Sequence, residues 1–320
     1  MKKNTNKKPK IVFLDVSTIG EVYNLYHFEE IGNFITYENT KPDQRLERMS
    51  DCQIVITNKV VIDREVIDSS PSLELICVAA TGMNNIDTEY AKEKGIIVKN
   101  VAGYSTESVA QSTFSMLFYL MHSTLYYHRY VKDGRYAQSE IFTHHGPPFI
   151  ELKGKQFGII GLGAIGKRVA FLAEAFGSSV IYFSTSGRNT DTNFKHISLD
   201  NLLSISDIVS IHCPLNEQTK NLLDTEKLKL MKPTSYLLNT SRGGIIDEFA
   251  LAKALDNEWI TGAALDVLSK EPIDPDNPLL KIKLKDKILI TPHIAWSSKE
   301  ARTLLIEKII ENIRDFLSCQ

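Results

Sequence analysis

The sequence is poor in the features that mark disulfide-rich and metal-binding proteins. It has only four cysteines and two tryptophans in 320 residues. The cysteines lie far apart, with no C-x-x-C pair and no histidine at metal-ligand spacing from any of them. Neither a disulfide framework nor a metal site is predicted. Reduced thiols, and with them a cytoplasmic location, are expected.

Long apolar runs and an excess of one charge are also missing. The longest nearly apolar stretch, Phe114 to Met121, contains Ser115 and falls far short of the roughly 20 residues of a membrane span. Residues 1–10 are basic but lack the apolar region of a signal peptide, so a solvated tail is predicted. The 37 basic and 39 acidic side chains give a formal net charge of -2. We therefore expect neither a membrane nor a nucleic-acid partner.

Short β-rich runs alternate with helical stretches twice along the chain. The first series has such runs at residues 11–14, 34–37, 53–57, 73–79 and 96–98. The second has them at residues 157–160, 180–183, 207–211, 235–238, 262–267 and 288–290. This alternation predicts two doubly wound α/β domains, each with a parallel sheet covered by helices. The length of the chain also suits two domains.

The segments around these series set the expected domain limits. Residues 106–131 have few helix breakers and are predicted to form one long helix, followed by a loop that contains Gly134 and Gly146. Residues 299–317 form an amphipathic helix that is predicted to pack back onto the first domain. We expect a first domain of residues 1–101 and 294–320 and a second domain of residues 102–293.

The segment Gly161-Leu-Gly-Ala-Ile-Gly166 follows a predicted strand and opens a predicted helix, as a dinucleotide-binding fingerprint requires. Gly161 permits the tight turn, Gly163 lets a pyrophosphate approach the backbone, and Gly166 allows close packing of helix and strand. The amides of Ala164 and Ile165 then face the anion at the helix N-terminus. The second domain is predicted to be a Rossmann domain.

The end of the second strand of that domain distinguishes NAD from NADP. Proteins that bind NAD usually have Asp or Glu there, bonded to the ribose hydroxyls. Here the strand runs into Ser184-Thr-Ser-Gly-Arg188, without a carboxylate. Ser184, Thr185 and Arg188 suit the 2′-phosphate of NADP, and a solvated loop with one surface arginine is the alternative. The cofactor is predicted to be NAD or NADP.

Polar side chains follow the later strands of the second domain, at the edge where such sheets bind ligands. An arginine, Arg242, a glutamate, Glu271, and a histidine, His293, suit the interconversion of 2-hydroxy and 2-keto acids. The guanidinium would bind the substrate carboxylate and polarise the carbonyl, and the imidazole would transfer the proton. Glu271 would orient the imidazole and stabilise its charged form. Asp266 would orient the carboxamide of the nicotinamide.

Six motifs carry a resemblance to a known family, and they are Ala79–Asp87, Asn100–Gln111, Gly161–Gly166, Asn239–Asp247, Ala264–Val267 with Glu271-Pro272, and Thr291–Trp296. They resemble the D-isomer-specific 2-hydroxyacid dehydrogenases from about residue 54 to residue 302. The resemblance implies a flavodoxin-like substrate domain and a Rossmann cofactor domain with a cleft between them. It also implies a catalytic triad of Arg242, Glu271 and His293, and a homodimer formed through the cofactor domain.

The resemblance extends to the binding residues. It implies cofactor contacts from Ala164, Ile165, Ser184, Thr240 and Asp266. Cys213, Pro214 and Ser241, at the ends of the same strands, are predicted to contact the cofactor as well. It implies substrate contacts from Asn58, Lys59, Thr81 and Gly82, with the backbone of the last two holding the carboxylate. Residues 57–60, 79–85 and 293–297 are most similar to glycerate dehydrogenases, also called hydroxypyruvate reductases, so the expected substrate pair is D-glycerate and hydroxypyruvate, or glyoxylate.

Two alternatives stay open. The same fold and triad serve enzymes that act on D-lactate or 3-phosphoglycerate, although a phosphorylated substrate would need more basic groups than Lys59 alone. The other alternative is a nucleotide-sensing binding protein, since relatives such as the C-terminal binding proteins act as corepressors. The complete triad argues for an enzyme.

Overall fold

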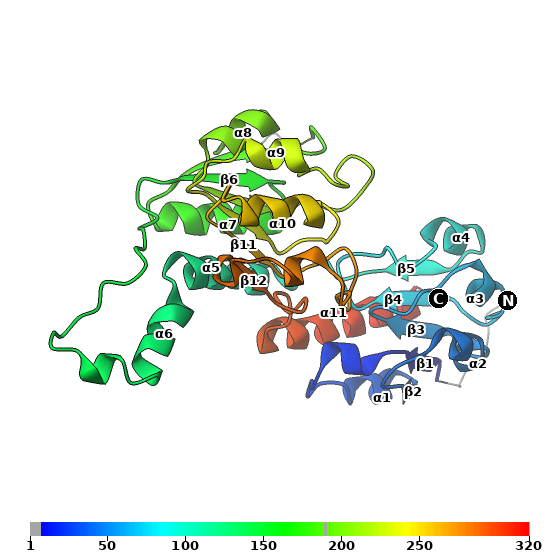
Figure 1. Ribbon diagram of the computed structural model, residues 1–320. Coiled ribbons are helices and arrows are strands. Elements are labelled where there is room, and N and C mark those ends of the chain that lie inside the picture. Colours follow the sequence, from blue (N-terminus) through cyan, green and yellow to red (C-terminus); the bar gives the residue numbers. More distant parts are fainter. Residues whose placement is uncertain (1–7, 189–190, 192, 320) are drawn as a thin grey trace. The chain divides into compact units, whose positions relative to one another are not determined.

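The structure is a computed structural model that describes residues 8–188, 191 and 193–319, so residues 1–7 of the predicted tail lie outside it. The chain divides into two compact units. One runs to Ser105 and resumes at Ser297, and the other is Thr106–Trp296. The expected limits lay a few residues earlier at both crossings. Each unit contains one parallel sheet (Figure 1).

The first unit has a five-stranded sheet with the order β2-β1-β3-β4-β5, and all neighbouring strands are parallel. This is the flavodoxin-like order, as predicted. Its elements are β1 (Lys10–Phe13), η1 (Val16–Ile19), α1 (His27–Ile31), β2 (Asn33–Thr36), η2 (Pro42–Gln44), α2 (Arg45–Met49), β3 (Ile54–Thr57), α3 (Arg64–Asp68), β4 (Leu75–Val78), α4 (Thr88–Glu93), β5 (Ile97–Lys99) and α11 (Lys299–Ser318).

Burial explains why the central strands of this unit could be predicted. Every residue of β3 and β4 is buried, because helices cover both faces of a parallel sheet and the strands become continuous apolar runs. Helix α11 starts at Ser298, whose hydroxyl accepts a hydrogen bond from the Ala301 amide at 3.1 Å. It buries a stripe that includes Leu305, Ile309 and Ile313.

The second unit has a seven-stranded parallel sheet with the order β12-β11-β10-β9-β6-β7-β8. Counted from β6, this is the Rossmann order with one more strand beyond the sixth. Its elements are α5 (Thr106–Met121), α6 (Thr124–Lys132), η3 (Tyr136–Gln138), β6 (Gln156–Ile160), α7 (Ala164–Ala175), β7 (Ser179–Phe183), β8 (Lys195–His196), α8 (Leu199–Ile205), β9 (Ile208–Ile211), α9 (Thr225–Lys229), β10 (Tyr236–Asn239), α10 (Glu248–Asp256), β11 (Gly262–Leu265), η4 (Pro278–Leu280), η5 (Lys285–Lys287) and β12 (Ile288–Ile290).

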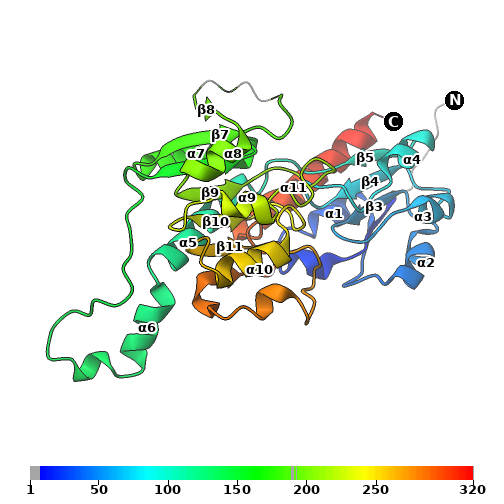
Figure 2. The same ribbon diagram turned by 45° about the horizontal axis from the view of Figure 1, so that its top comes forward.

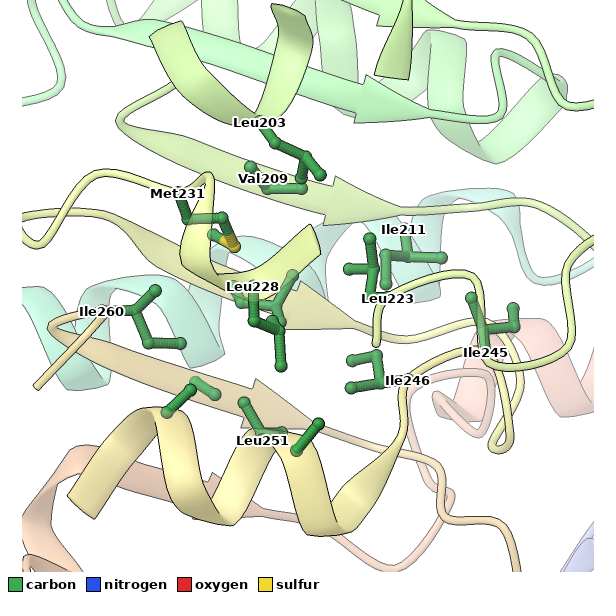
Figure 3. Packing of buried hydrophobic residues seen from close by; sticks show 14 of the residues in the cluster. Leu203, Val209, Ile211, Leu223, Leu228, Met231, Ile245, Ile246, Leu251 and Ile260 are labelled. Carbon is green, nitrogen blue, oxygen red and sulfur yellow. The ribbon is translucent and has the colours of Figure 1, made fainter. Parts of the chain in front are cut away.

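Two apolar layers hold this sheet between helices. On one face, buried residues of α8, α9 and α10 pack on the strands, with Leu203, Leu228 and Leu251 among them (Figure 3). On the other face, α5 and α7 pack through residues such as Leu117 and Val169. The sheet is thereby covered on both sides, and only its strand ends are open to ligands.

The prediction of one long helix at residues 106–131 is wrong. The structure has α5 and α6, separated at Ser123, whose φ of 47° places it in the left-handed region. The aromatic spacing continues across the break, which is why the pattern hid it. Helix α6 and the segment after it extend away from the sheet in both ribbon views (Figures 1 and 2). In the described part of the chain, no helix has the length and apolar character to cross a membrane.

Candidate active site

Close packing explains two of the three glycines in the turn between β6 and α7. Gly161 has a φ of +92°, and a Cβ there would lie 2.7 Å from the amide nitrogen of Cys213. A Cβ at Gly166 would lie 2.2 Å from the carbonyl oxygen of Gly161. Gly163 differs, because no protein atom lies within 4 Å of the position of its Cβ. A side chain at Gly163 would therefore enter open space in front of the turn.

The start of α7 fits the pyrophosphate of a dinucleotide. Its N-cap is Gly163, which has no side chain to bond the first turn, whereas Asp224 and Asp247 cap α9 and α10 in the same unit. Among the described residues, the amides of Ala164 and Ile165 donate to no acceptor. Free amides, open space and the positive end of the helix dipole together suit an anion.

The strand after this helix ends without an acid. Ser184, at the end of β7, is buried, while Arg188 is exposed and its amide donates to Ser186 Oγ at 3.3 Å. The next described acid, Asp191, pairs with Lys167 Nζ at 2.8 Å. The structure therefore has a guanidinium in this loop, and the carboxylate that follows it is paired with a lysine.

The carboxyl ends of the other strands lie side by side. Asn239 of β10 is opposite Leu265 of β11, and Leu265 is opposite Ile290 of β12. On its other side, Asn239 is opposite Ile211 of β9. The loops that carry Arg242, Asp266 and His293 therefore leave the sheet from adjacent positions, as predicted for this edge.

Glu271 and His293 form a hydrogen-bonded pair. His293 Nδ1 lies 2.7 Å from one carboxylate oxygen of Glu271, Oε2. The other oxygen, Oε1, accepts a hydrogen bond from the Leu268 amide at 2.9 Å, which fixes the direction of the carboxylate. Because Nδ1 faces Glu271, the opposite ring nitrogen, Nε2, points away from it. This is the arrangement of a histidine that exchanges a proton through Nε2.

The backbone holds His293 in a conformation that a histidine seldom adopts. Its φ is 56°, in the left-handed region. Its amide donates to the Asp266 carbonyl at 2.8 Å, and its carbonyl accepts from Trp296 Nε1 at 2.9 Å. A strained residue kept in place by its surroundings is typical of functional sites.

The side chain of Asp266 shapes the loop that carries His293. It is only 2 % exposed, and its carboxylate accepts hydrogen bonds from Thr291 Oγ1 at 2.6 Å, from the Ile294 amide at 2.9 Å and from the Ala295 amide at 2.8 Å. Burial raises the pKa of this carboxyl above its usual range, and the hydrogen bonds oppose that shift. The predicted contact of Asp266 with the nicotinamide stays a prediction, whereas its hold on this loop is visible.

The loop of Arg242 is anchored on both sides. Asn239 Nδ2 donates to the Arg242 carbonyl at 2.8 Å, and Ser241 Oγ donates to the Cys213 carbonyl at 2.9 Å. The guanidinium itself donates through Nη1 to the Ser241 carbonyl at 2.7 Å. Arg242 is thus tied to the strand that ends beside the glycine turn.

Gly243 joins this loop to the Glu271–His293 pair. A Cβ on Gly243 would lie 1.9 Å from the carbonyl oxygen of Leu268, so the two backbones are in direct contact. Leu268 is the residue whose amide bonds Glu271. The structure therefore brings the loop of Arg242 against the loop of Glu271. Gly243 lies in one of the six family motifs, and its spacing there does not indicate this contact.

Three further predicted cofactor residues lie at this edge. Thr240 Oγ1 is 3.0 Å from Thr113 Oγ1 of α5, and both side chains are buried. Burial raises the pKa of the Cys213 thiol to about 12, so this cysteine is unreactive near neutral pH. Pro214 is exposed, and its carbonyl accepts from Thr219 Oγ1 at 2.7 Å.

The predicted substrate residues belong to the first unit. Among the described residues, the amides of Thr81 and Gly82 donate to no acceptor, so they are open to an anion. Asn58 is 5 % exposed and its side-chain amide donates to Thr18 Oγ1 at 3.0 Å. The side chain of Lys59 is exposed, while its backbone amide donates to an aspartate, Asp15. Asp15 lies outside the six family motifs, so the sequence did not indicate this bond.

Comparisons with known proteins identify the family. Residues 114–295, more than half of the chain, match the family described as D-isomer specific 2-hydroxyacid dehydrogenase, NAD binding domain. A putative 2-hydroxyacid dehydrogenase of Haemophilus influenzae is 40% identical over 309 residues, 96% of this chain and 98% of the relative. A hydroxypyruvate reductase of Blautia hydrogenotrophica is 37% identical over 90% of each chain. A glycerate dehydrogenase of Methylorubrum extorquens is 34% identical over 97% of this chain and 96% of its own.

Similar solved structures have the same fold as this chain. An acyclic imino acid reductase in complex with NADPH and D-Arg has a TM-score of 0.86 at 32% identity and covers 97% of each chain. A D-lactate dehydrogenase from Aquifex aeolicus, complexed with NAD and lactic acid, has a TM-score of 0.84 at 27% identity over 96% of this chain and 95% of its own. The chain belongs to the D-isomer specific 2-hydroxyacid dehydrogenase family and is an NAD(P)-dependent oxidoreductase.

Proposed function

We propose that this chain reduces hydroxypyruvate to D-glycerate, and glyoxylate more weakly, with a reduced nicotinamide cofactor. The observation that carries the proposal is the 2.7 Å bond between His293 and Glu271, held against the loop of Arg242 by Gly243. The names of two relatives, hydroxypyruvate reductase and glycerate dehydrogenase, support the choice of acid.

Each residue of the triad has one task. Arg242 binds the carboxylate of the keto acid and polarises its carbonyl. A dinucleotide whose pyrophosphate is held at the glycine turn would supply the hydride from its reduced nicotinamide. His293 Nε2 donates the proton to the carbonyl oxygen, and Glu271 stabilises the charged imidazole before transfer. In the reverse direction His293 accepts the proton of the hydroxyl group.

The proposed substrate contacts of the first unit are Thr81, Gly82 and Lys59. The two free amides of Thr81 and Gly82 suit a carboxylate. Lys59, exposed at the same sheet edge, would face the polar end of hydroxypyruvate. Pyruvate lacks the hydroxyl group of hydroxypyruvate, so D-lactate dehydrogenase activity is expected to be weaker.

A panel of keto acids tests the proposal. Hydroxypyruvate, glyoxylate, pyruvate and 3-phosphohydroxypyruvate are each assayed with NADH and with NADPH by the loss of reduced nicotinamide absorbance. We expect the highest kcat/KM with hydroxypyruvate. A protein that binds NADPH tightly but turns over none of the four acids would instead be a nucleotide-sensing protein.

NADPH is the proposed cofactor. The exposed guanidinium of Arg188 after β7, where no carboxylate ends the strand, suits a 2′-phosphate. The similar imino acid reductase was solved with NADPH, whereas the similar D-lactate dehydrogenase was solved with NAD. The ratio of KM values for NADPH and NADH in the same panel decides between them.

A second copy of the chain is the proposed partner, bound through the α6 arm, which is residues 124–151. The arm has its own internal support, because Tyr126 bonds His144 at 2.9 Å and the Tyr130 ring stacks on His144 at 3.7 Å. It nevertheless leaves Ile141 exposed and Phe142 91 % exposed. A pocket of about 730 Å³ opens at the base of the arm. Its lining includes Tyr126 and Arg129 of the arm and Lys287 of the second unit's sheet region. Apolar groups presented on a firm extension are typical of an interface.

The mass in solution tests this assembly. Light scattering after gel filtration is expected to give twice the mass of the 36.1 kDa chain, and Phe142→Asp is expected to give a monomer. A wild-type protein that stays monomeric at assay concentration would contradict the dimer.

The four cysteines are all free, three of them buried, which supports action in the reducing cytoplasm.

A further inference from the structure

A buried acid that the proposed chemistry does not use lies at the carboxyl end of β1. Asp15 is 2 % exposed. One of its oxygens accepts a hydrogen bond from the Asn58 amide at 2.9 Å, and the other accepts from the Lys59 amide at 2.6 Å and from the Val60 amide at 3.3 Å. Three successive amides of the loop after β3 therefore point at one carboxylate.

A run of amides that converge in this way forms an anion-binding concavity. The chain fills this one with its own carboxylate. The neighbouring loop, after β4, differs, because the amides of Thr81 and Gly82 donate to no acceptor among the described residues. Thr57 is opposite Val78 in the sheet, so both loops start at the same edge. The amides of the loop after β3 are bonded to Asp15, whereas these two amides of the loop after β4 remain available to an external anion.

Further hydrogen bonds hold the filled loop in place. Asn58 Nδ2 donates to Thr18 Oγ1 at 3.0 Å, and Thr18 Oγ1 donates to the Asp15 carbonyl at 2.7 Å. From the other side, Asn85 Nδ2 donates to the Val60 carbonyl at 2.9 Å. The backbone of residues 58–60 is thus bonded on both sides, while the side chain of Lys59 remains exposed.

Electrostatics shows that this arrangement has an energetic cost. Burial raises the pKa of Asp15, and the amides of residues 58–60 oppose that shift. A buried carboxylate persists because several donors satisfy it. Removing the negative oxygen would leave these amides without an acceptor and would free the loop.

We propose that Asp15 is a positioning residue for substrate binding, which holds residues 58–60 in the conformation that presents Lys59 to the polar end of a small 2-keto acid. This inference rests on the proposed function, in which Asn58 and Lys59 contact the substrate. Asp15 acts through the backbone of the loop and does not itself touch the substrate. Its loss should therefore weaken substrate binding and leave cofactor binding and the proton transfer intact.

Asp15→Asn tests the inference with little change of shape. The asparagine keeps one acceptor oxygen and turns an NH₂ group towards amides that need an acceptor. The KM for hydroxypyruvate is expected to rise about tenfold or more, with kcat changed less than about threefold. The Kd for NADPH, measured by fluorescence, is expected to stay within about twofold of wild type. Asp15→Glu, which keeps the charge on a longer side chain, should give an intermediate KM.

Val66→Ala is the matched control. Val66 is fully buried in α3 of the same unit, and its backbone bonds the side chains of Asp63 and Ser70 rather than Asp15 or residues 58–60. It should lower Tm through a small cavity while leaving the KM unchanged. If Val66→Ala raises the KM as much as Asp15→Asn does, the effect is general loosening and the inference is wrong.

The outcomes separate this inference from the proposed function. A wild-type enzyme active on hydroxypyruvate, with an unchanged KM in Asp15→Asn, overturns the role of Asp15 alone. A wild-type protein that turns over no 2-keto acid overturns the proposed function and this inference with it. If Asp15→Asn does not fold, hydrogen exchange of the wild type decides, because amides at residues 58–60 that exchange as fast as free amides would refute the contact.

Discussion

Replacing Gly243 with alanine tests the contact that joins Arg242 to the Glu271–His293 pair. The added methyl carbon would lie 1.9 Å from the carbonyl oxygen of Leu268 and 2.0 Å from its carbonyl carbon. Atoms of this kind rest about 3.5 Å apart, so the two backbones must separate by roughly 1.5 Å. A misplacement of about 1 Å in a catalytic arrangement costs about 10²-fold in rate. We expect kcat to fall by about 10²-fold for Gly243→Ala.

Steady-state kinetics with hydroxypyruvate, together with NADPH binding and Tm, measure this effect. Gly163→Ala is the matched control, because its methyl group meets no protein atom within 4 Å and stands where the pyrophosphate is expected. That variant should keep its Tm and raise the KM for the cofactor. Gly243→Ala should bind NADPH normally and lose turnover. A kcat within about threefold of wild type would show that the contact does not position the triad.

Three other predictions follow from the structure. His293→Ala is expected to lower kcat by about 10² to 10⁴-fold, and near-wild-type turnover would remove its role in proton transfer. Arg188→Ala should raise the KM for NADPH far more than the KM for NADH, because only NADPH carries the 2′-phosphate, and equal effects would contradict that contact. Burial lowers the pKa of His212 to about 3, so between that pH and its unfolded value of about 6.5 the unfolded chain binds a proton that the folded chain does not. Stability from this group is complete above pH 6.5 and declines as the pH falls, by about 2 kcal/mol at pH 5. The free energy of unfolding, measured with urea at pH 8 and pH 5, should differ less between the two pH values in His212→Asn than in the wild type. The same pH dependence in both proteins would refute this role of His212.

The fold was predictable where strands are buried on both faces. The mostly apolar runs at β3, β6 and β9 needed no other signal, because parallel strands between helix layers are buried along nearly their whole length. Two features escaped prediction. Strand β8 is only Lys195–His196, and both residues are exposed, so it has no apolar pattern. The break at Ser123 depends on one left-handed residue inside a continuing aromatic pattern.

The candidate site was predictable as a set of residue types and less so as a set of contacts. The glycine turn and the three predicted catalytic residues lie in motifs whose spacing indicates their chemistry. The contact between Gly243 and Leu268 joins backbones 25 positions apart in the numbering, and no local pattern indicates it. Asp15 is similar, because its three donors lie on another strand's loop. The role of Asp266 in shaping the His293 loop could not be predicted, because it depends on where its hydrogen-bond donors lie in space.

The late position of α11 in the sequence determines the order in which the protein can form on the ribosome. The part of the first unit that ends at Ser105 is made before the second unit, whereas the buried stripe of α11, from Leu305 to Ile313, is made after it. The second unit, from Thr106 to Trp296, is uninterrupted and can fold as soon as its last strand has left the exit tunnel. Until α11 has been made, the apolar surface that it will cover stays open to chaperones and to neighbouring nascent chains.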